Sequence, residues 1–216
     1  MIIYLKTFIL LLKIPIYFNS ISLFYKVYFL SSSVQTRIFS ILHPRSLCLK
    51  PLENEAFVDP TRDESLVFEL LDLKQDVADD GSAVWFLQDL ATEQDAEGFT
   101  VIEQSGVVEA GGLRYRNMAA VVTTAVGQMA ISKGRQGREA QNIVYLANLR
   151  LKEVGTDVLI TAYEPILINP FSDSAGTVGA GLPVPAEQSG HMPMTEVFKM
   201  AVSSFKVNDW SLFGAA

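Results

Sequence analysis

Residues 63–73 read Asp-Glu-Ser-Leu-Val-Phe-Glu-Leu-Leu-Asp-Leu, and their pattern predicts an amphipathic helix. The hydroxyl of Ser65 can accept a hydrogen bond from an unpaired first-turn N–H, so we expect the helix to begin there. Leu66, Leu70 and Leu73 recur at spacings of four and three residues, which places them on one helical face. This face should pack against an apolar part of the protein.

Glu69 and Asp72 lie outside that apolar face. Residues three apart are neighbours on a helix, and two like charges there destabilise it unless a cation lies between them. The spacing therefore indicates contact with a basic partner. A solvated acidic face on a surface helix gives the same pattern and is commoner, so the pair alone does not decide between the two interpretations.

The charge of the chain is unevenly distributed. Of its 216 residues, 24 are acidic and 17 are basic. The first fifty residues contain 6 basic residues and no acidic residue. The remainder therefore has 11 basic and 24 acidic residues, a formal charge of −13. An acidic body repels nucleic-acid phosphates and suits a partner with a basic face. The single cysteine, Cys48, excludes a disulfide framework and a cysteine-based zinc cluster, which fits cytosol or nucleus.

We divide the chain into a hydrophobic basic leader with a linker, residues 1–52, and one domain, residues 53–216. Lys6, Lys13 and Lys26 interrupt each apolar run that could span a membrane. The leader is similar to a signal peptide in its short apolar core and to a transit peptide in its lack of acids, but it has no small-residue cleavage site and few arginines. A third interpretation is a segment that is not native to the fold.

The rest of the domain predicts a mostly antiparallel sheet. Val, Ala, Thr and Ile fill residues 117–132, which we interpret as a long central strand. Hairpin-like joints between successive strands favour antiparallel pairing. Further strands are expected at residues 83–90, 99–108, 141–151 and 158–163, with turns or bulges at 111–112 and 154–157.

The last fifty residues predict a loop, a helix and a final turn. Residues 165–193 are rich in proline, glycine and serine and should form a long loop. Residues 195–205 have an apolar face and predict a second helix, which Thr195 can cap. Residues 209–213 should form a last ordered turn, with its two aromatic residues as core anchors, namely Trp210 and Phe213.

Motifs for catalysis and phosphate binding are missing from the sequence. The glycines of residues 176–181 are followed by prolines, where a dinucleotide-binding turn requires a helix. Residues 133–138 lack the Gly-Lys-Ser/Thr ending of a phosphate loop. We predict that they form a basic hairpin tip. His43 and His191 lie in the leader and the proline-rich loop, which does not favour a general base. We therefore predict a protein that is not an enzyme and has no cofactor or metal.

Several blocks together resemble one family. The first is Glu55-Ala-Phe-Val-Asp-Pro60, followed by Asp63, Ser65 and Phe68-Glu-Leu-Leu-Asp72. Further blocks follow in the same order as in that family, at residues 85–90, Gly127-Gln128, Leu149-Arg-Leu151, Thr156-Asp157, Glu164-Pro165 and 205–213. Over residues 53–216 the chain resembles the Ran guanine nucleotide release factors, the Mog family.

The resemblance implies an α/β (α+β) sandwich with about six mostly antiparallel strands and helices on both faces. It also implies binding of the small GTPase Ran, in its GTP form, and promotion of nucleotide release in support of nucleocytoplasmic transport. The positions that match the family's acidic pair are Glu69 and Asp72, and we add Asp63 and Asp59 to the predicted Ran contact. A monomer in nucleus and cytoplasm is expected.

Two alternatives stay open. A lumenal, photosystem-associated protein of the related extrinsic-subunit fold would explain a leader that resembles a targeting segment. A hydrolase or other small-molecule enzyme would require a pocket that the sequence does not reveal. Likeness of fold alone would not separate these possibilities.

Overall fold

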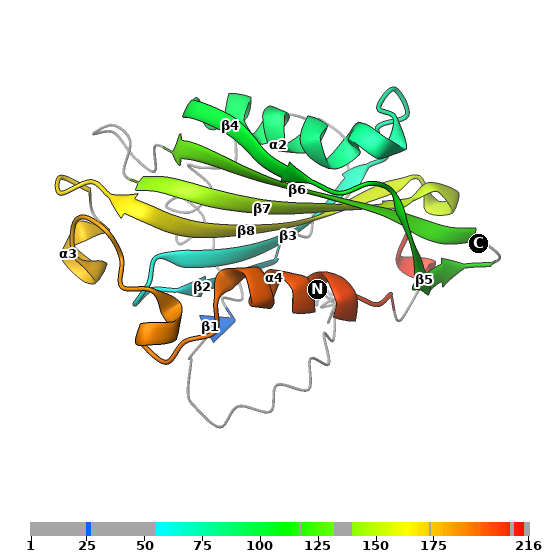
Figure 1. Ribbon diagram of the computed structural model, residues 1–216. Coiled ribbons are helices and arrows are strands. Elements are labelled where there is room, and N and C mark those ends of the chain that lie inside the picture. Colours follow the sequence, from blue (N-terminus) through cyan, green and yellow to red (C-terminus); the bar gives the residue numbers. More distant parts are fainter. Residues whose placement is uncertain are drawn as a thin grey trace, which may run out of the picture.

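An open antiparallel sheet forms the central layer of the protein, with a long helix on each face (Figure 1). The computed structural model describes residues 25–26, 55–116, 118–131, 140–172, 174–207 and 210–213. Within these ranges the sheet has eight strands: seven follow the order β1-β2-β3-β8-β7-β6-β4, and β5, off this path, pairs with β6. The predicted α+β sandwich is therefore confirmed, with more strands than the six expected.

The strands are β1 (Tyr25–Lys26), β2 (Glu55–Asp59), β3 (Glu64–Asp72), β4 (Glu97–Gln104), β5 (Val108–Tyr115), β6 (Met118–Ile131), β7 (Ala140–Leu151) and β8 (Thr156–Ile168). The helices are α2 (Ser82–Glu93), α3 (Ala175–Val178) and α4 (Met194–Ser204), with short 3-10 turns η1 (Asp79–Gly81), η2 (Lys152–Val154), η3 (Ala186–Gln188) and η4 (Trp210–Phe213).

The three long strands β6, β7 and β8 confirm the predictions made from β-branched and apolar residues. β6 and β7 pair from Val121 opposite Arg150 to Ile131 opposite Ala140. β7 turns into β8 through η2 and Gly155, whose φ of 62° favours glycine. β8 extends to Ile168, five residues beyond the predicted end. The bulge expected at residues 111–112 is confirmed as a register shift in β5.

The predicted helix over residues 63–73 is wrong, because this segment forms β3, a strand inside the sheet. β3 pairs with β2 on one side and with β8 on the other. Ser65, the predicted cap, lies opposite Val58 and Tyr163. A strand between two others contains apolar residues on both faces, and such a run also contains helical spacings. The pairing across the sheet, which is not local, decided the outcome.

The predicted strand over residues 83–90 is also wrong, because this segment forms α2. Its buried residues recur at spacings of three and four and pack on β6 and β7, namely Ala83, Phe86, Leu87, Leu90 and Ala91. The helix lies close to the sheet at Gly127 of β6, where an added Cβ would lie 2.9 Å from Leu87 Cδ2 and 3.2 Å from the Thr100 carbonyl oxygen. The spacing of these apolar residues was the local signal that favoured a helix.

α4 packs on the opposite face of the sheet and confirms the second predicted helix. Its buried residues, Met194, Phe198 and Ala201, join the core that includes Leu66 and Phe68 of β3. The predicted cap is wrong: the N-cap position is Pro193, and the Thr195 hydroxyl instead donates a hydrogen bond to Tyr145 Oη at 3.0 Å.

The remaining predictions concern the two ends of the chain and the long loop. The loop begins after Ile168 and includes α3 and η3. η4 confirms the final turn, and its Trp210 and Phe213 pack against the core on the α4 side. The leader, apart from β1, and the hairpin tip at residues 133–138 lie outside the described residues. None of the described helices has the length and apolar character needed to cross a membrane.

Candidate functional site

The fold places Glu69 and Asp72 on opposite faces of the sheet. Side chains alternate along a strand, so residues three apart point in opposite directions. Glu69 is half-buried on the face that carries α2, whereas Asp72 is exposed at the end of β3, opposite Thr156. The predicted arrangement of the two carboxylates on one side is therefore wrong, because it depended on the helix.

Asp59 and Asp63 belong to the turn between β2 and β3. Asp59 is only 3% exposed, and its Oδ1 accepts hydrogen bonds from the backbone N–H and the hydroxyl of Thr61 at 2.9 and 2.7 Å. Asp63 is half-buried with a φ of 55°. Of the four predicted contact residues, Asp72 alone is exposed, whereas Asp59 is buried and bonds to its own turn. Their contact with Ran stays a prediction.

The same turn holds the long β8–α4 loop in place. Arg62 donates from Nε to Glu64 Oε1 at 2.8 Å, and from Nη1 to the Val184 carbonyl at 3.1 Å and the Ser189 hydroxyl at 3.0 Å. Burial raises the pKa of Glu64, and the adjacent Arg62 opposes that shift. These polar groups therefore connect two segments of the chain, which is a structural role.

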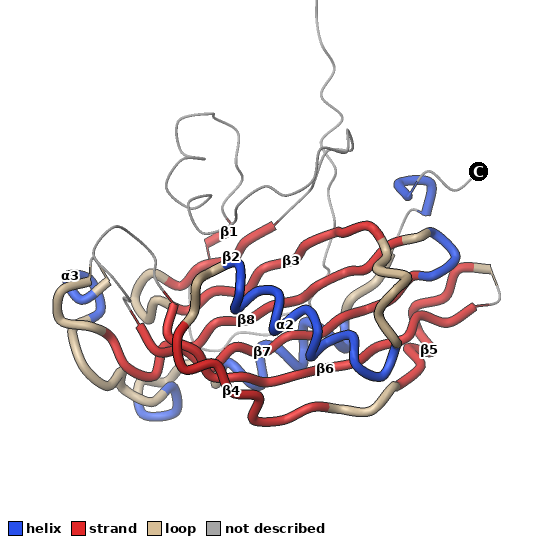
Figure 2. The backbone as a smooth tube through the Cα atoms, turned by 90° about the horizontal axis from the view of Figure 1, so that it is seen from above, coloured by secondary structure: helices blue, strands red, loops and turns tan. Residues whose placement is uncertain are grey.

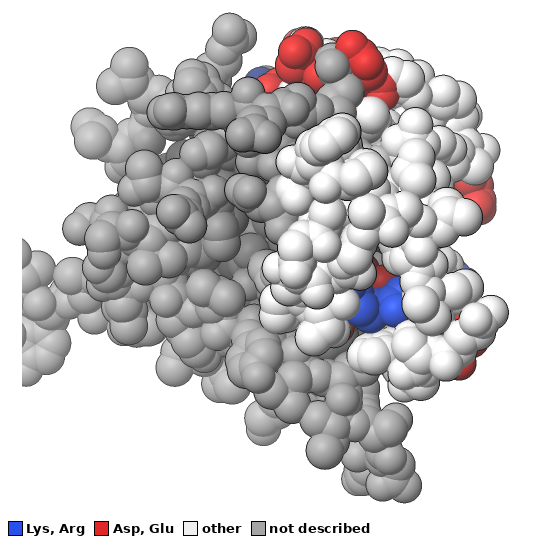
Figure 3. Space-filling model, turned by 90° about the vertical axis from the view of Figure 1, so that its left-hand side faces the viewer, with Lys and Arg blue, Asp and Glu red and all other residues white. Residues whose placement is uncertain are grey.

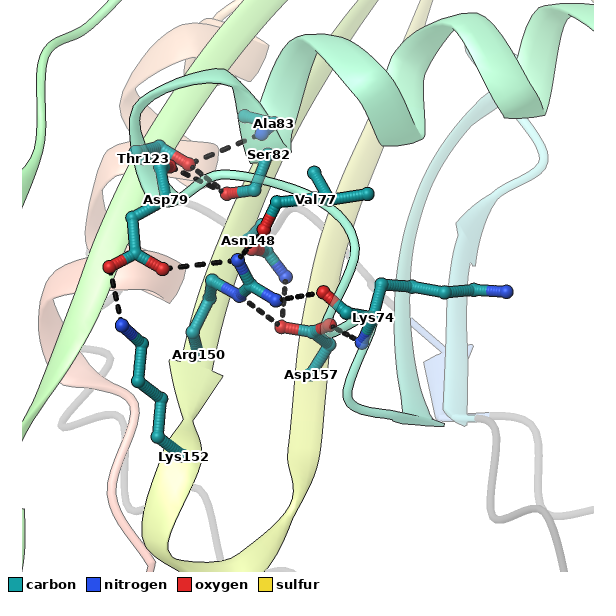
Figure 4. A network of polar contacts seen from close by, with 10 residues as sticks. All are labelled: Lys74, Val77, Asp79, Ser82, Ala83, Thr123, Asn148, Arg150, Lys152 and Asp157. Atoms are coloured by element: carbon teal, nitrogen blue, oxygen red, sulfur yellow. Dashed lines mark hydrogen bonds and ion pairs between the residues drawn. The ribbon is translucent and has the colours of Figure 1, made fainter.

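A buried polar cluster, which we call the Arg150 node, holds the loop between β3 and α2 (Figure 4). Arg150 is 3% exposed and donates from Nε to Asp157 Oδ1 at 3.1 Å and from Nη1 to Asp79 Oδ1 at 3.0 Å. Its guanidinium also bonds to the carbonyls of Val77 and Lys74. The node consists of Lys74, Val77, Asp79, Asn148, Arg150 and Asp157.

Asp157 completes the node from β8. It is fully buried; its Oδ2 accepts from the Lys74 backbone N–H at 2.9 Å, and its Oδ1 also accepts from Asn148 Nδ2 at 3.2 Å. A planar guanidinium suits this role because its donors point in fixed directions. Sequence analysis did not assign this cluster a role, although an arginine between Leu149 and Leu151 in an apolar strand was a signal that it would need a buried partner.

A second polar cluster lies beneath the C-terminal end of α2, and we call it the acceptor recess. Figure 2 shows α2 crossing the strands obliquely, so that this end lies toward β8 and β3. Gln94, just after the helix, donates from Nε2 to Tyr163 Oη at 3.2 Å. The recess consists of Glu69, Glu93, Gln94 and Tyr163.

Electrostatics in the recess favour protonated groups. Burial, and to a smaller extent the negative charge of Glu93, raise the pKa of Glu69 to about 7. Burial and the charge of Glu69 raise the pKa of the Tyr163 hydroxyl. Gln94 is 7% exposed, and its Oε1 has no hydrogen-bond partner among the described residues. The recess therefore contains several acceptors and a carboxyl group that is partly protonated near neutral pH.

Acidic residues also gather on the surface near this end of α2. Figure 3 shows a group of Asp and Glu side chains at the top of one side of the molecule. Glu93, Asp95 and Glu97, which follow one another at the end of α2 and the start of β4, are all exposed. This end of the domain presents negative charge, as the composition of residues 53–216 predicts.

The described residues do not suggest a metal or small-molecule site. They contain no group of three or more His, Cys, Asp or Glu side chains that could hold a metal ion. A crevice lined by Leu113, Tyr115, Leu151 and Trp210, among others, has room for little more than a water molecule. The charged groups that we describe either connect parts of the chain or lie at one end of α2.

Fold and site together define an α+β sandwich whose recognisable polar features are structural contacts and a charged surface. A family model described as Ran-interacting Mog1 protein matches residues 51–165. The chain belongs to this Mog1 family, which confirms the resemblance identified in the sequence.

Curated relatives are consistent with this family. The Ran guanine nucleotide release factor of Homo sapiens is 27% identical over 164 residues, which cover 76% of this chain and 82% of the relative. The protein of the same name from Danio rerio is 28% identical over 130 residues, 58% of this chain and 69% of the relative. The crystal structure of the Saccharomyces cerevisiae Ran-binding protein Mog1p aligns with a TM-score of 0.46 and 17% identity over 81% of this chain and 87% of that one.

The two curated relatives are both named Ran guanine nucleotide release factors. The lumenal photosystem-associated alternative is not favoured by any of these matches.

Proposed function

We propose that this protein binds the small GTPase Ran and promotes the release of its guanine nucleotide. The observation that carries the proposal is the match of residues 51–165 to the Ran-interacting Mog1 family, supported by relatives that are named Ran guanine nucleotide release factors. The proposal includes a role in nucleocytoplasmic transport, with the protein in nucleus and cytoplasm, and a preference for the GTP form of Ran.

The charge of the domain supports a basic contact surface on the partner. The chain after residue 50 has a formal charge of −13, and exposed carboxylates lie at the end of β3 and at the end of α2. Complementary charge accelerates association and sets orientation more than it adds affinity. In this proposal the exposed Asp72 contacts a basic side chain of Ran directly, and Glu69 contributes from the recess.

Release requires that the protein bind one conformation of Ran more tightly than another. A ligand shifts a conformational equilibrium only by the difference between its affinities for the two states. The proposed mechanism is therefore that the acidic surface favours a conformation of Ran that holds nucleotide and magnesium less tightly. The release factor itself performs no bond chemistry in this scheme.

The test is the release of a fluorescent GTP analogue from loaded Ran on addition of the full-length protein. Acceleration is expected, and Asp72→Lys should weaken the binding of Ran by about tenfold, which corresponds to about 1.4 kcal/mol. Glu187→Lys is the matched control, because it makes the same change of charge at an exposed position in η3. It should alter affinity by less than about twofold if contact is local. Equal losses in both variants would contradict the role of Asp72, and no binding by the unaltered protein would contradict the function.

A further inference from the structure

The loop between β8 and α4 carries the two most exposed large apolar side chains of the described residues. Phe171 is 83% exposed and Leu182 is 81% exposed, and Leu167 and Val184 are exposed as well. They lie close to one bridge, in which Ile168 pairs with the residue before Leu182. We call Leu167, Phe171, Leu182 and Val184 the loop patch. Apolar side chains that gather on the surface of a folded domain mark an interaction surface.

Hydrogen bonds hold the loop patch in a fixed shape. Arg62, in the turn between β2 and β3, donates to the carbonyl of Val184 at 3.1 Å. The backbone N–H of Phe171 donates to Asn169 Oδ1 at 2.9 Å, and the bridge at Ile168 has two backbone bonds of 2.8 and 2.9 Å. Because the backbone is already ordered, a contact on the patch costs little conformational entropy.

The loop patch lies in a weakly charged part of an acidic domain. The described loop, residues 169–172 and 174–193, contains one acidic residue, Glu187, and no lysine or arginine. Figure 3 looks at the molecule from this end and shows uncharged side chains over most of the described surface. The occupant should therefore be apolar. A second copy of this chain is disfavoured, because each copy brings a domain with a formal charge of −13.

The beginning of the chain starts from the same end of the sheet. β1 is antiparallel to β2, with Tyr25 opposite Val58, so residues 1–24 leave β1 on the side of the turn between β2 and β3. Arg62 of that turn bonds to Val184 of the loop patch. A segment of this chain is therefore tethered beside the patch.

Residues 1–24 have the composition and the length to cover the patch. They are mostly Ile, Leu, Phe and Tyr, with Lys6 and Lys13 and without an acidic residue, which suits both an apolar surface and an acidic domain. A helix of this length spans about 36 Å, and an extended chain spans more. Seven strands side by side measure about 30 Å across. The segment can therefore reach the patch in either conformation.

We propose that residues 1–24 pack on the loop patch of the same chain and cover Phe171, Leu182 and Val184. The contact removes apolar surface of both segments from water. The tether at β1 makes the contact intramolecular, so a weak affinity is sufficient to keep the patch covered. The contact does not depend on the proposed function.

Paramagnetic NMR of the full-length protein tests the contact. A nitroxide at position 180 (Ala180→Cys in a Cys48→Ser background) lies beside the patch without replacing one of its residues. The Ile and Leu methyl signals of residues 2–12 should lose most of their intensity. The control label, at position 153 (Glu153→Cys), lies in η2 at the other end of β8, about 40 Å away along the strand, and should leave these signals unchanged.

The double variant Phe171→Asp with Leu182→Asp tests the apolar nature of the contact. Two carboxylates on the patch should displace the segment, because charged groups resist burial against apolar side chains. Trypsin should then cleave after Lys6 and Lys13 about tenfold faster, since the segment is open to the protease for a larger share of the time. The matched control is Ile102→Asp with Val108→Asp, which changes two exposed apolar residues elsewhere on the surface and should leave the cleavage rate unchanged.

Three outcomes would overturn the proposal. In the first, the two labels have the same effect on the methyl signals and the two double variants are cleaved at the same rate. In the second, the broadening arises between chains, which a mixture of nitroxide-labelled and isotope-labelled protein reveals, and the occupant is a second copy. In the third, the methyl signals are unaffected and the patch variant binds Ran more weakly than its control does, so the patch is a contact for the partner.

Discussion

The Arg150 node and the acceptor recess are both buried and polar, but they satisfy their groups differently. In the node, a guanidinium donates to two carboxylates and two backbone carbonyls, and Asp157 accepts from three donors. In the recess, burial and the nearby charge of Glu93 raise the pKa of Glu69 to about 7. Each cluster also contains one buried amide oxygen without a hydrogen-bond partner among the described residues, Asn148 Oδ1 in the node and Gln94 Oε1 in the recess. The clusters therefore differ in the charge state of their carboxyl groups: Arg150 pairs with two carboxylates in the node, whereas burial favours the protonated form of Glu69 in the recess.

This difference separates a structural cluster from a candidate for binding. A buried ion pair whose donors and acceptors are satisfied fixes the chain around it, and removing one member leaves the other uncompensated. A buried carboxyl without a cation remains close to neutral and responds to pH or to an arriving charge. Substitutions in the two clusters should therefore differ in size and in pH dependence.

The largest effect is expected for Arg150→Met. The substitution leaves Asp157 buried without its cation and removes the donor to the loop after β3. The free energy of unfolding should fall by about 3–5 kcal/mol, as for other broken buried pairs. Urea denaturation followed by circular dichroism measures this loss.

The double variant Arg150→Met with Asp157→Leu is the control for the first prediction. It removes the buried charge as well as its partner and should recover part of the lost stability. A single variant within about 1 kcal/mol of the unaltered protein would contradict the structural role of the node.

A smaller and pH-dependent effect is expected for Glu69→Gln. The pKa of Glu69 rises from 4.5 to about 7 on folding, so the folded state binds the proton more tightly than the unfolded state. The contribution of Glu69 to the free energy of unfolding is fully present below pH 4.5. It is lost as the pH rises through about 7, which lowers the free energy of unfolding by about 2–3 kcal/mol. Glu69→Gln should lack this decline. Its free energy of unfolding, compared with that of the unaltered protein, should therefore be higher at pH 8 than at pH 5.

Denaturant unfolding at several pH values between 4.5 and 8 tests this prediction. Part of the slope should persist in Glu69→Gln, because burial also raises the pKa of Glu64. If the unaltered protein and the variant show parallel pH profiles, Glu69 does not hold a proton in the folded state, and the recess is no different from an ordinary surface.

The smallest effect is expected for Lys152→Ala, at the edge of the node. Lys152 pairs with Asp79, but its side chain is 41% exposed, and solvent screens an ion pair of this kind. The free energy of unfolding should change by less than about 1 kcal/mol. A loss as large as that for Arg150→Met would mean that burial does not decide how much an ion pair of Asp79 contributes to stability.

Local patterns predicted the type of β6, β7 and α4 and gave the wrong type for β3 and α2. β6 and β7 contain long runs of β-branched and small apolar residues, and α4 has one apolar face, so pattern and structure agree. Residues 63–73 were predicted as a helix and residues 83–90 as a strand, because short apolar runs fit both the helical and the strand periodicity. For β3 the pairing with β2 and β8 decided the outcome.

The candidate site was predictable only in its charge. Composition indicated an acidic domain, and the family resemblance directed attention to Glu69 and Asp72. The acceptor recess, by contrast, includes residues from β3 and β8 and from both sides of the end of α2, and no spacing in the sequence relates Gln94 to Tyr163.

The sequence by itself determined the family, the acidic character of the domain, the long strands and the second helix, because each depends on composition or on residues close together in the chain. The tertiary structure alone decided that residues 63–73 form a strand, that Glu69 and Asp72 point to opposite faces, and that Arg150 meets Asp157 while Glu69 lies near Glu93. Burial and pairing set the charge state of such groups, and both arise only when distant segments pack together.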